Sequence, residues 1–306
     1  MLRSMAGFAM KGLWQSAFVV ALLSLGALLL PPLSYLASGV IVLATLRIGP
    51  VEGAKVLAAA LLVAIIAASL ILGQYSLALI MFVTSWLPVY GITLVLGYSR
   101  SMTLSLLASA GLGIAVVLAI HLFIAEPAAW WFGMLTPLME LLQGTDGWQL
   151  DQAQTQALFS EIAKLMTGLM AAAVMLNVVI GLLIGRAWQA SLYDPGAFGN
   201  EFCQIRLGKP AALLTTALLL LTLLSLPAGL QFIVDCLPVM LVVFALQGIA
   251  IAHALVRQRN KSKFWLIAMY VMLVFMLPQM VLLLAMLGVI EQWVNFRKHS
   301  SENNAE

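Results

Sequence analysis

Charged side chains are scarce in this sequence. Asp, Glu, Lys and Arg make up only 9% of its 306 residues, whereas hydrophobic residues make up 63%. Soluble domains contain about 25% charged residues. One soluble core could not shield so many apolar side chains from water, whereas a lipid bilayer removes that need. The composition therefore excludes an ordinary soluble domain and predicts a single integral membrane domain over residues 1–306.

Cysteine and histidine are almost absent. The chain has two cysteines, Cys203 and Cys236, and three histidines, His121, His253 and His299. The histidines lie far apart in the sequence, without the spacing of a metal site. The two cysteines are expected on opposite faces of the membrane, where they could not form a disulfide. We therefore expect neither a metal nor a cofactor.

Sequence signatures of catalysis are also missing. The patterns GxSxG, HExxH and GxxxxGK[S/T] do not occur, and no paired-carboxylate site is recognisable. We expect that the chain is not an enzyme, and that any ATP-driven role would need a separate ATPase subunit. The net charge of +3 comes without a basic stripe interleaved with aromatic residues, so nucleic-acid binding is not expected either.

Long apolar runs are what the sequence does have. A helix needs about 20 apolar residues to cross a bilayer, and fewer where the bilayer thins. The run at 13–30 resembles a signal peptide but lacks a cleavage site and is interpreted as a retained helix. These runs predict an all-α, polytopic transmembrane helix bundle, with spans at 13–30, 33–46, 51–72, 77–96, 102–124, about 162–183, 211–226 and 230–256.

The last apolar run, 264–294, is too long for one ordinary span, and Pro278 near its middle would kink or break it. One kinked helix gives nine crossings; a hairpin of two short helices gives ten. With ten, all of the 15 Lys and Arg residues except Lys164 lie on the side of the N-terminus, whereas with nine Arg297 and Lys298 also move across. Cytoplasmic loops are enriched in Lys and Arg, so we favour ten crossings and a cytoplasmic N-terminus.

Two longer loops interrupt the spans. In the loop at 125–161, which is predicted to be external, apolar residues at near-helical spacing over 130–142 predict a helix lying on the membrane surface. Asp151 is placed to cap a following helix that continues into the next span. This loop forms either a lid over an outward-facing cavity or a plain connector. The loop at 186–210 is predicted to be cytoplasmic, and residues 299–306 form a polar tail.

Small residues recur at a spacing of four within several of the spans. Gly181 and Gly185 do so in one, and Gly111, Ala115 and Ala119 in another. Such rows let helices approach closely where lipid supplies no hydrophobic driving force. Packing within one chain is favoured here over a dimer face.

Polar residues inside spans are the first candidates for a functional site, because they are costly in lipid. We single out Asn177, Gln231 and Asp235 as ligand contacts. Gln231 and Asp235 are four residues apart and so share a helix face. The alternative is that Asp235 is a paired or hydrated acid at the membrane interface.

The cytoplasmic loop offers a second candidate site. Phe198, Phe202 and Leu207 could fold back on the bundle, and Arg206 is a candidate partner for Glu201. The loop is then either a folded cap or a docking face for a partner, whose contacts would be Tyr193, Asp194, Phe198, Glu201 and Phe202.

The loop sequence Tyr-Asp-Pro-Gly-Ala-Phe at 193–198, the basic turn at 257–263 and the ending Leu-Gly-Val-Ile-Glu-Gln-Trp-Val-Asn-Phe-Arg at 287–297 resemble the YybS-like family of bacterial inner-membrane proteins. That family is distantly similar to the substrate-binding components of energy-coupling-factor transporters. The resemblance implies a multi-pass protein of the bacterial inner membrane that works with a coupling subunit and ATPases. It also implies that Ala17 and Ala21, at the AxxxA spacing of such components, touch the coupling subunit.

Two functions are consistent with these features. The first is a transporter-like subunit that binds a small solute from the outer side. The second is a non-transporting membrane scaffold that recruits a partner, such as another membrane protein, through its cytoplasmic loop. The lipid bilayer is the surrounding medium in both.

Overall fold

The computed structural model describes residues 2–145, 148–224 and 227–297, and these residues form helices and connecting turns without a strand. The predicted polar tail at 299–306 lies outside the described residues. In chain order the elements are α1 (Leu2–Ala9), α2 (Leu13–Gly26), α3 (Leu33–Ile48), α4 (Pro50–Leu72), α5 (Ser76–Met81), the π-helix η1 (Phe82–Trp86), α6 (Leu87–Ser99), α7 (Met102–Phe123), α8 (Pro127–Gln143), α9 (Gln152–Tyr193), α10 (Ala197–Cys203), α11 (Lys209–Leu221), the 3-10 helix η2 (Ala228–Leu230), α12 (Gln231–Asp235), α13 (Leu237–Gln258), α14 (Phe264–Phe275) and α15 (Leu277–Val294).

Among the described residues, six helical segments are long and apolar enough to cross a membrane: α4, the segment from α5 to α6, α7, α9, the segment from α12 to α13, and α15. Four shorter apolar helices, α2, α3, α11 and α14, accompany them. The predicted spans all fall on these helices. The prediction of an all-α integral membrane protein with several membrane helices is therefore confirmed.

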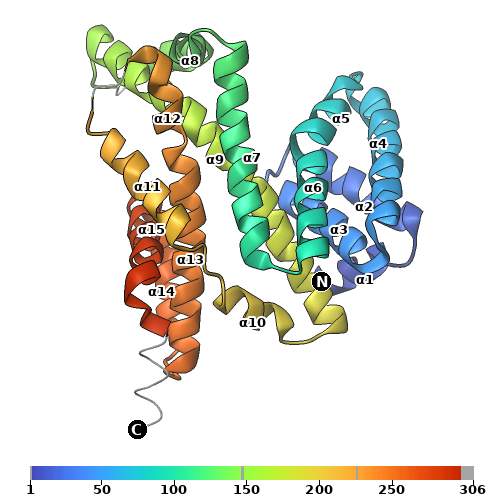
Figure 1. Ribbon diagram of the computed structural model, residues 1–306. Coiled ribbons are helices and arrows are strands. Elements are labelled where there is room, and N and C mark those ends of the chain that lie inside the picture. Colours follow the sequence, from blue (N-terminus) through green and yellow to red (C-terminus); the bar gives the residue numbers. More distant parts are fainter. Residues whose placement is uncertain (1, 146–147, 225–226, 298–306) are drawn as a thin grey trace.

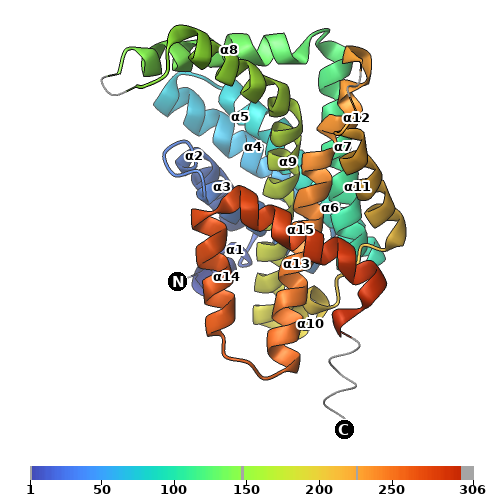
Figure 2. The ribbon, with the colours of Figure 1, turned by 90° about the vertical axis from the view of Figure 1, so that its left-hand side faces the viewer.

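The last apolar run is broken into two helices. Helix α14 ends at Phe275, and α15 begins at Leu277 on the other side of Met276. Pro278 lies in the first turn of α15, where a missing backbone N–H leaves no intrahelical bond unmade. Figure 2 shows that α15 crosses α13 at an angle, while α14 stands beside α13 and is joined to it by a loop.

Helix α9 is longer than the span predicted within it. The Asp151 side chain accepts a hydrogen bond from the Gln154 backbone N–H at 2.7 Å, and the Gln154 side chain accepts one from the Asp151 N–H at 3.2 Å. This capping box begins the helix as predicted. The helix then continues for 42 residues, so residues 186–193 of the predicted loop are helical.

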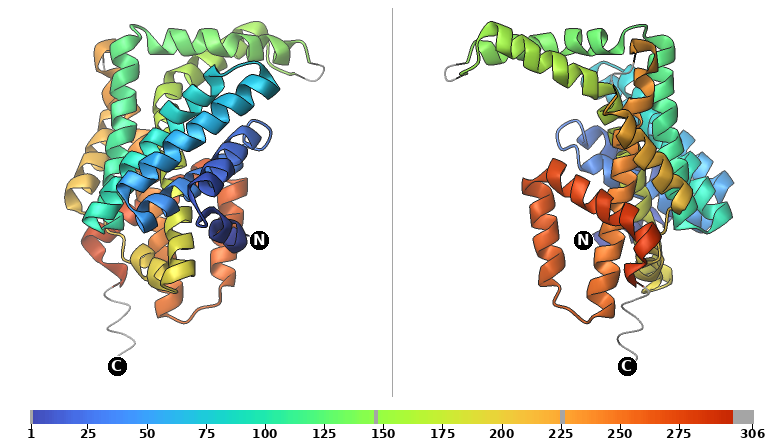
Figure 3. Two further views of the ribbon diagram at one scale, coloured as in Figure 1. Left: turned by 90° about the vertical axis from the view of Figure 1, so that its right-hand side faces the viewer. Right: turned by 60° about the vertical axis from the view of Figure 1, so that its left-hand side comes forward.

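The helices form two groups with α7 and α9 between them. In Figure 1, α1 to α6 lie on one side of these two helices and α11 to α15 on the other. We call the end of the molecule at which α8 lies the α8 end, and the opposite end, at which α10 lies, the α10 end. Helix α8 lies across the α8 end of the molecule (Figure 3) and packs on α9 without burying any of its own residues completely. A helix is thus present where one was predicted over 130–142, and its position on the membrane surface stays a prediction.

Glycines allow the closest helix contacts. A Cβ atom on Gly181 would lie 2.4 Å from Cβ of Ser38, and one on Gly185 would lie 2.4 Å from Cβ of Val42, so α9 and α3 touch through these glycines. The predicted packing within the chain is confirmed for this pair. The other row is different, because Gly111, Ala115 and Ala119 of α7 are all exposed.

Candidate functional site

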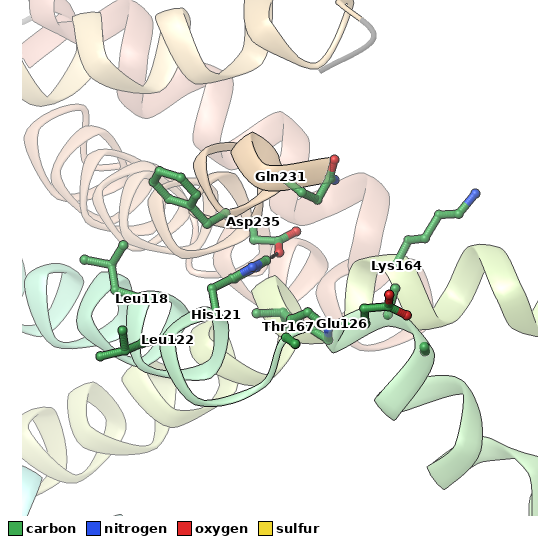
Figure 4. Close-up of a pocket in the computed structure, with 14 residues that line it drawn as sticks. Leu118, His121, Leu122, Glu126, Lys164, Thr167, Gln231 and Asp235 are labelled. Carbon is green, nitrogen blue, oxygen red and sulfur yellow. Dashed lines mark hydrogen bonds and ion pairs between the residues drawn. The ribbon is translucent and has the colours of Figure 1, made fainter. Parts of the chain in front are cut away.

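A cavity of about 830 Å³ lies near the α8 end, between α7, α9 and the turn that leads into α12 (Figure 4). Its walls are largely apolar, with a small number of polar side chains. Cavities that bind small molecules typically measure about 300–1,000 Å³ and have this character. The lining residues are Leu118, His121, Leu122, Ala125, Glu126, Pro127, Ala128, Ala129, Lys164, Thr167, Gly229, Gln231, Phe232 and Asp235.

His121 and Asp235 form a close pair in this cavity. His121 Nε2 and Asp235 Oδ2 are 2.8 Å apart, and their side chains are 19% and 6% exposed. An ionised carboxylate can only accept, so the imidazole N–H is the donor. The ring of Phe232 meets the His121 ring edge-on at 6.2 Å between centroids. The hydrogen bond from His121 therefore fixes the orientation of the buried Asp235 carboxylate, and both residues line the cavity.

The local backbone explains why Asp235 faces the cavity. The short helix α12 ends at Asp235, and α13 begins at Leu237 with Pro238 in its first turn. On the neighbouring helix, a Cβ atom at Gly168 would lie only 2.6 Å from the Asp235 backbone oxygen. The absence of a side chain at Gly168 lets α9 approach the backbone that carries the acid.

The charges around the cavity are unequal. Lys164 Nζ lies 2.6 Å from Glu161, which is not part of the lining, and Figure 4 shows the lysine side chain extending away from the His121–Asp235 pair. Glu126, the residue before α8, makes no ion pair among the described residues. The cavity therefore holds two carboxylates, and its one ammonium group is already paired elsewhere.

The structure separates the predicted ligand contacts. Gln231 and Asp235 both line the cavity, as their spacing predicts. Asn177 lies elsewhere, because it follows Thr167 by about ten residues, or about 15 Å, along the continuous helix α9. Its Nδ2 donates to Ser85 Oγ at 2.9 Å in the π-helix η1, and its buried Oδ1 has no partner among the described residues. Asn177 therefore does not belong to the same site.

His121 is the cavity residue that sequence analysis failed to connect with Asp235. The two residues are 114 positions apart and lie on different helices. The only sequence signal is that each is a polar residue near the end of its span that is predicted to face outward, which is the C-terminal end for His121 and the N-terminal end for Asp235. That signal shows a common depth in the membrane but not which helices are neighbours.

The loop at the α10 end folds against the bundle. Phe198 and Phe202 pack against the core, and Leu207 is buried. The predicted pairing of Glu201 with Arg206 is wrong. Glu201 accepts hydrogen bonds from Nε and Nη2 of Arg186, with Nε at 2.9 Å, because the helical extension of α9 brings Arg186 alongside α10.

Arg206 turns instead toward a network around Glu291. This acid is fully buried; it accepts from the Phe296 backbone N–H at 2.7 Å and from Arg297 Nε at 2.9 Å, and Arg206 lies 3.8 Å away. Arg297 also donates to the carbonyls of Cys203 and Ile205 at 2.7 and 3.0 Å. The network ties the loop to α15.

Tyr193 and Asp194 are exposed and border a second cavity, of about 450 Å³, at the α10 end. The Arg47 guanidinium lies 4.0 Å from the centre of the Tyr193 ring. Arg47 and Arg100 also border this cavity, and neither makes an ion pair among the described residues. Of the predicted docking residues, these two tyrosine and aspartate side chains remain open to a partner.

Ala17 and Ala21 of α2 are buried in the chain's own core, at 0% and 1% exposure. A coupling subunit could reach them only after α2 moved away from its neighbours.

Other chemistry has little support at either end. Across residues 2–145, 148–224 and 227–297, no three His, Cys, Asp or Glu side chains gather as metal ligands. Cys203 and Cys236 are free thiols. Burial raises the pKa of the Cys203 thiol, against the lowering effect of the nearby Arg257 and Arg297. Comparison of the chain with protein-family models, curated proteins and solved structures finds no match.

Proposed function

We propose that this integral membrane protein binds a small solute in the cavity at the α8 end and serves as the solute-binding subunit of a transporter. The observation that carries the proposal is the His121–Asp235 pair, an ionisable pair within an apolar segment that opens into a cavity of about 830 Å³. Ionisable groups inside membrane segments typically mark ligand or ion pathways. The role is binding rather than catalysis.

The membrane in this proposal is the bacterial inner membrane, with ten crossings and with the N-terminus and the α10 end in the cytoplasm. The break at Met276 supports two separate segments in the last apolar run, and the basic residues Arg186, Arg206 and Arg297 all lie at the α10 end. A reporter fused to the C-terminus tests this topology. A fluorescent protein that folds only in the cytoplasm should fluoresce there, and a silent fusion paired with active external alkaline phosphatase would contradict it.

A coupling subunit and ATPases complete the proposed transporter, in line with the resemblance to YybS-like proteins. Such partners would contact exposed faces rather than Ala17 and Ala21, because these two alanines are buried.

The test is purification of the full chain from its native membrane in mild detergent, followed by mass spectrometry of retained small molecules and proteins. Wild-type protein should retain a solute, and Asp235→Asn should lose it. Asp194→Asn, which changes an exposed acid at the other end, is the matched control and should retain it. Retention by Asp235→Asn equal to that of wild type would remove Asp235 from the site.

A scaffold role is the second candidate. It is favoured by the exposed Tyr193 and Asp194, which border the same cavity as Arg47 and Arg100, two arginines without an ion pair among the described residues. A partner protein captured by wild-type protein and lost from Tyr193→Ala would support this role. Capture that survives both Tyr193→Ala and Asp194→Asn would count against it.

A further inference from the structure

We infer that the cavity at the α8 end selects small amines, that is, molecules with one ammonium group attached to an apolar body. The inference rests on the proposed function, because it names the class of solute for the same site.

The charge of the cavity lining favours a cation. Asp235 and Glu126 are acids without a Lys or Arg ion pair among the described residues, and Lys164 is paired with Glu161 outside the lining. A carboxylate or phosphate group entering the cavity would meet like charge in a partly desolvated space. An ammonium group would meet opposite charge, whose attraction is stronger where water is excluded.

One carboxylate oxygen of Asp235 is an acceptor for a ligand that donates hydrogen bonds. His121 occupies Oδ2, whereas Oδ1 has no hydrogen-bond partner among the described residues and is not sealed from the cavity. A carboxylate oxygen is an acceptor only, so it recognises a donor. The ammonium group supplies up to three donors and a positive charge at one atom, which matches one free oxygen better than a neutral hydroxyl does.

The apolar side chains of the lining favour an apolar body on the ligand. Leu118, Leu122 and Phe232 form walls around the acid, and Ala125 and Ala128 leave space beside it. These surfaces favour an apolar group by removing it from water, and the ring face of Phe232 is also a favourable place for a cation. A sugar would leave many hydroxyl groups unpaired against these walls.

The experiment uses detergent-purified full-length protein and probes that share a phenylalkyl body and differ in the charged or neutral group at its end. 2-Phenylethylamine is compared with 2-phenylethanol and 3-phenylpropanoate, and 4-phenylbutylamine with the corresponding alcohol and carboxylate, by isothermal titration calorimetry at pH 7. The amine of one length should bind at least about 10-fold more tightly than its alcohol, and the carboxylate more weakly than either.

Variants connect that preference to the cavity. Asp235→Asn should reduce amine affinity to the level of the alcohol, and Glu126→Gln should reduce it by a smaller factor. Glu140→Gln changes an acid of α8 that is not part of the lining, and it should leave amine affinity unchanged. Size-exclusion profiles and thermal unfolding establish that each variant is folded.

Four results would overturn the inference. An alcohol or a carboxylate that binds as tightly as the amine and responds to Asp235→Asn would show a working site of another class, so the proposed function would stand. Amine binding that is unaffected by Asp235→Asn would place the amine outside this cavity. Failure of all probes to bind, while wild-type protein still retains a native solute, would reject amines alone; failure with no retained solute would reject both proposals.

Discussion

The two ends of the molecule each bury an acid, and they treat it differently. At the α10 end, Glu291 has a bond to each carboxylate oxygen, from the Phe296 N–H and from Arg297. At the α8 end, Asp235 has one partner, His121, and borders a cavity. Buried polar groups are normally fully hydrogen-bonded, and an incompletely bonded group needs a reason. Glu291 therefore holds helices together, whereas Asp235 keeps one carboxylate oxygen without a partner among the described residues and beside a cavity.

The same contrast extends to neutral polar side chains. Gln247 of α13 is buried; its Oε1 accepts from the Leu207 N–H and its Nε2 donates to the Gly288 carbonyl, both at 2.8 Å. Gln231 of α12 faces the cavity instead. Both are glutamines on one apolar segment, and only the one near the α10 end is fully used in packing.

The strongest test of the comparison removes the partner of Glu291. Arg297→Met should lower the free energy of unfolding by about 3–5 kcal/mol, because it leaves a buried carboxylate without its cation. Arg206, half-exposed and 3.8 Å from the carboxylate, forms only a longer ion pair and does not supply the hydrogen bond that Arg297 donates. The midpoint of thermal unfolding in mild detergent measures the effect.

The double variant Glu291→Leu and Arg297→Met is the control, and it should recover much of the loss, because no unpaired charge remains. A single variant as stable as wild type would show that Glu291 does not depend on Arg297, and the contrast between the two ends would fail.

A smaller effect is expected from a methyl group beside Asp235. Gly168→Ala places a Cβ atom 2.6 Å from the Asp235 carbonyl oxygen, so α9 or α12 must shift. Overpacking of this kind costs about 1–3 kcal/mol. Ligand retention should fall along with the unfolding midpoint, because the shift moves the acid.

Gly111→Ala is the matched control on α7, where a Cβ atom would meet nothing within 4 Å. It should keep the solute and gain up to about 1 kcal/mol from the better helix propensity of alanine. Equal loss of stability in both variants would mean that the close approach at Gly168 is not what positions Asp235.

Removing the partner of Asp235 should cost less than removing the partner of Glu291. His121→Phe deletes the donor but leaves the carboxylate beside a cavity in which water can replace it, so we expect a loss of about 1 kcal/mol. Thermal unfolding in the same detergent allows direct comparison with Arg297→Met. A loss as large as that of Arg297→Met would show that the α8 end is as dependent on its ion pair as the α10 end.

The last prediction concerns the rate at which the Cys203 thiol at the α10 end reacts, and no change in the free energy of unfolding is involved. The thiolate is the reactive form, and burial raises the Cys203 pKa, so maleimide labelling at pH 7 should be slower than that of an exposed cysteine. The rate should rise about tenfold per pH unit until the raised pKa is reached. Labelling of a Cys236→Ala protein between pH 7 and 9 measures this, and a rate that does not change with pH would contradict it.

The sequence predicts the helices well because their signals are local. Apolar runs, the break expected near Pro278 and the Asp151 cap each act within a few residues, and the corresponding elements are found where expected. Two residues of the candidate site, Gln231 and Asp235, are predictable for the same reason, because they share a helix face.

Pairings between helices could not be predicted in this way. The His121–Asp235 contact depends on α7 being a neighbour of α12, and no periodicity within either helix reveals that. Glu201 was assigned to the nearer Arg206 because the extra turns of α9, which bring Arg186 to it, lie beyond the apolar run. Asn177 is predicted as a ligand contact only because it is a polar residue inside a span, and that signal does not show which side chains it lies beside.

The unbroken length of α9 has a mechanical consequence. A helix of 42 residues is about 63 Å long, and even at a tilt of 40° it extends about 48 Å along the membrane normal, beyond a hydrocarbon layer of about 30 Å. This one helix carries Thr167 in the wall of one cavity, Gly168 against the backbone of Asp235, and Arg186 at the edge of the other cavity. A swing of about 5° about Gly168 would displace Arg186, about 27 Å further along, by roughly 2 Å. A displacement of α9 at one cavity would therefore move the border of the other, because one continuous helix joins them.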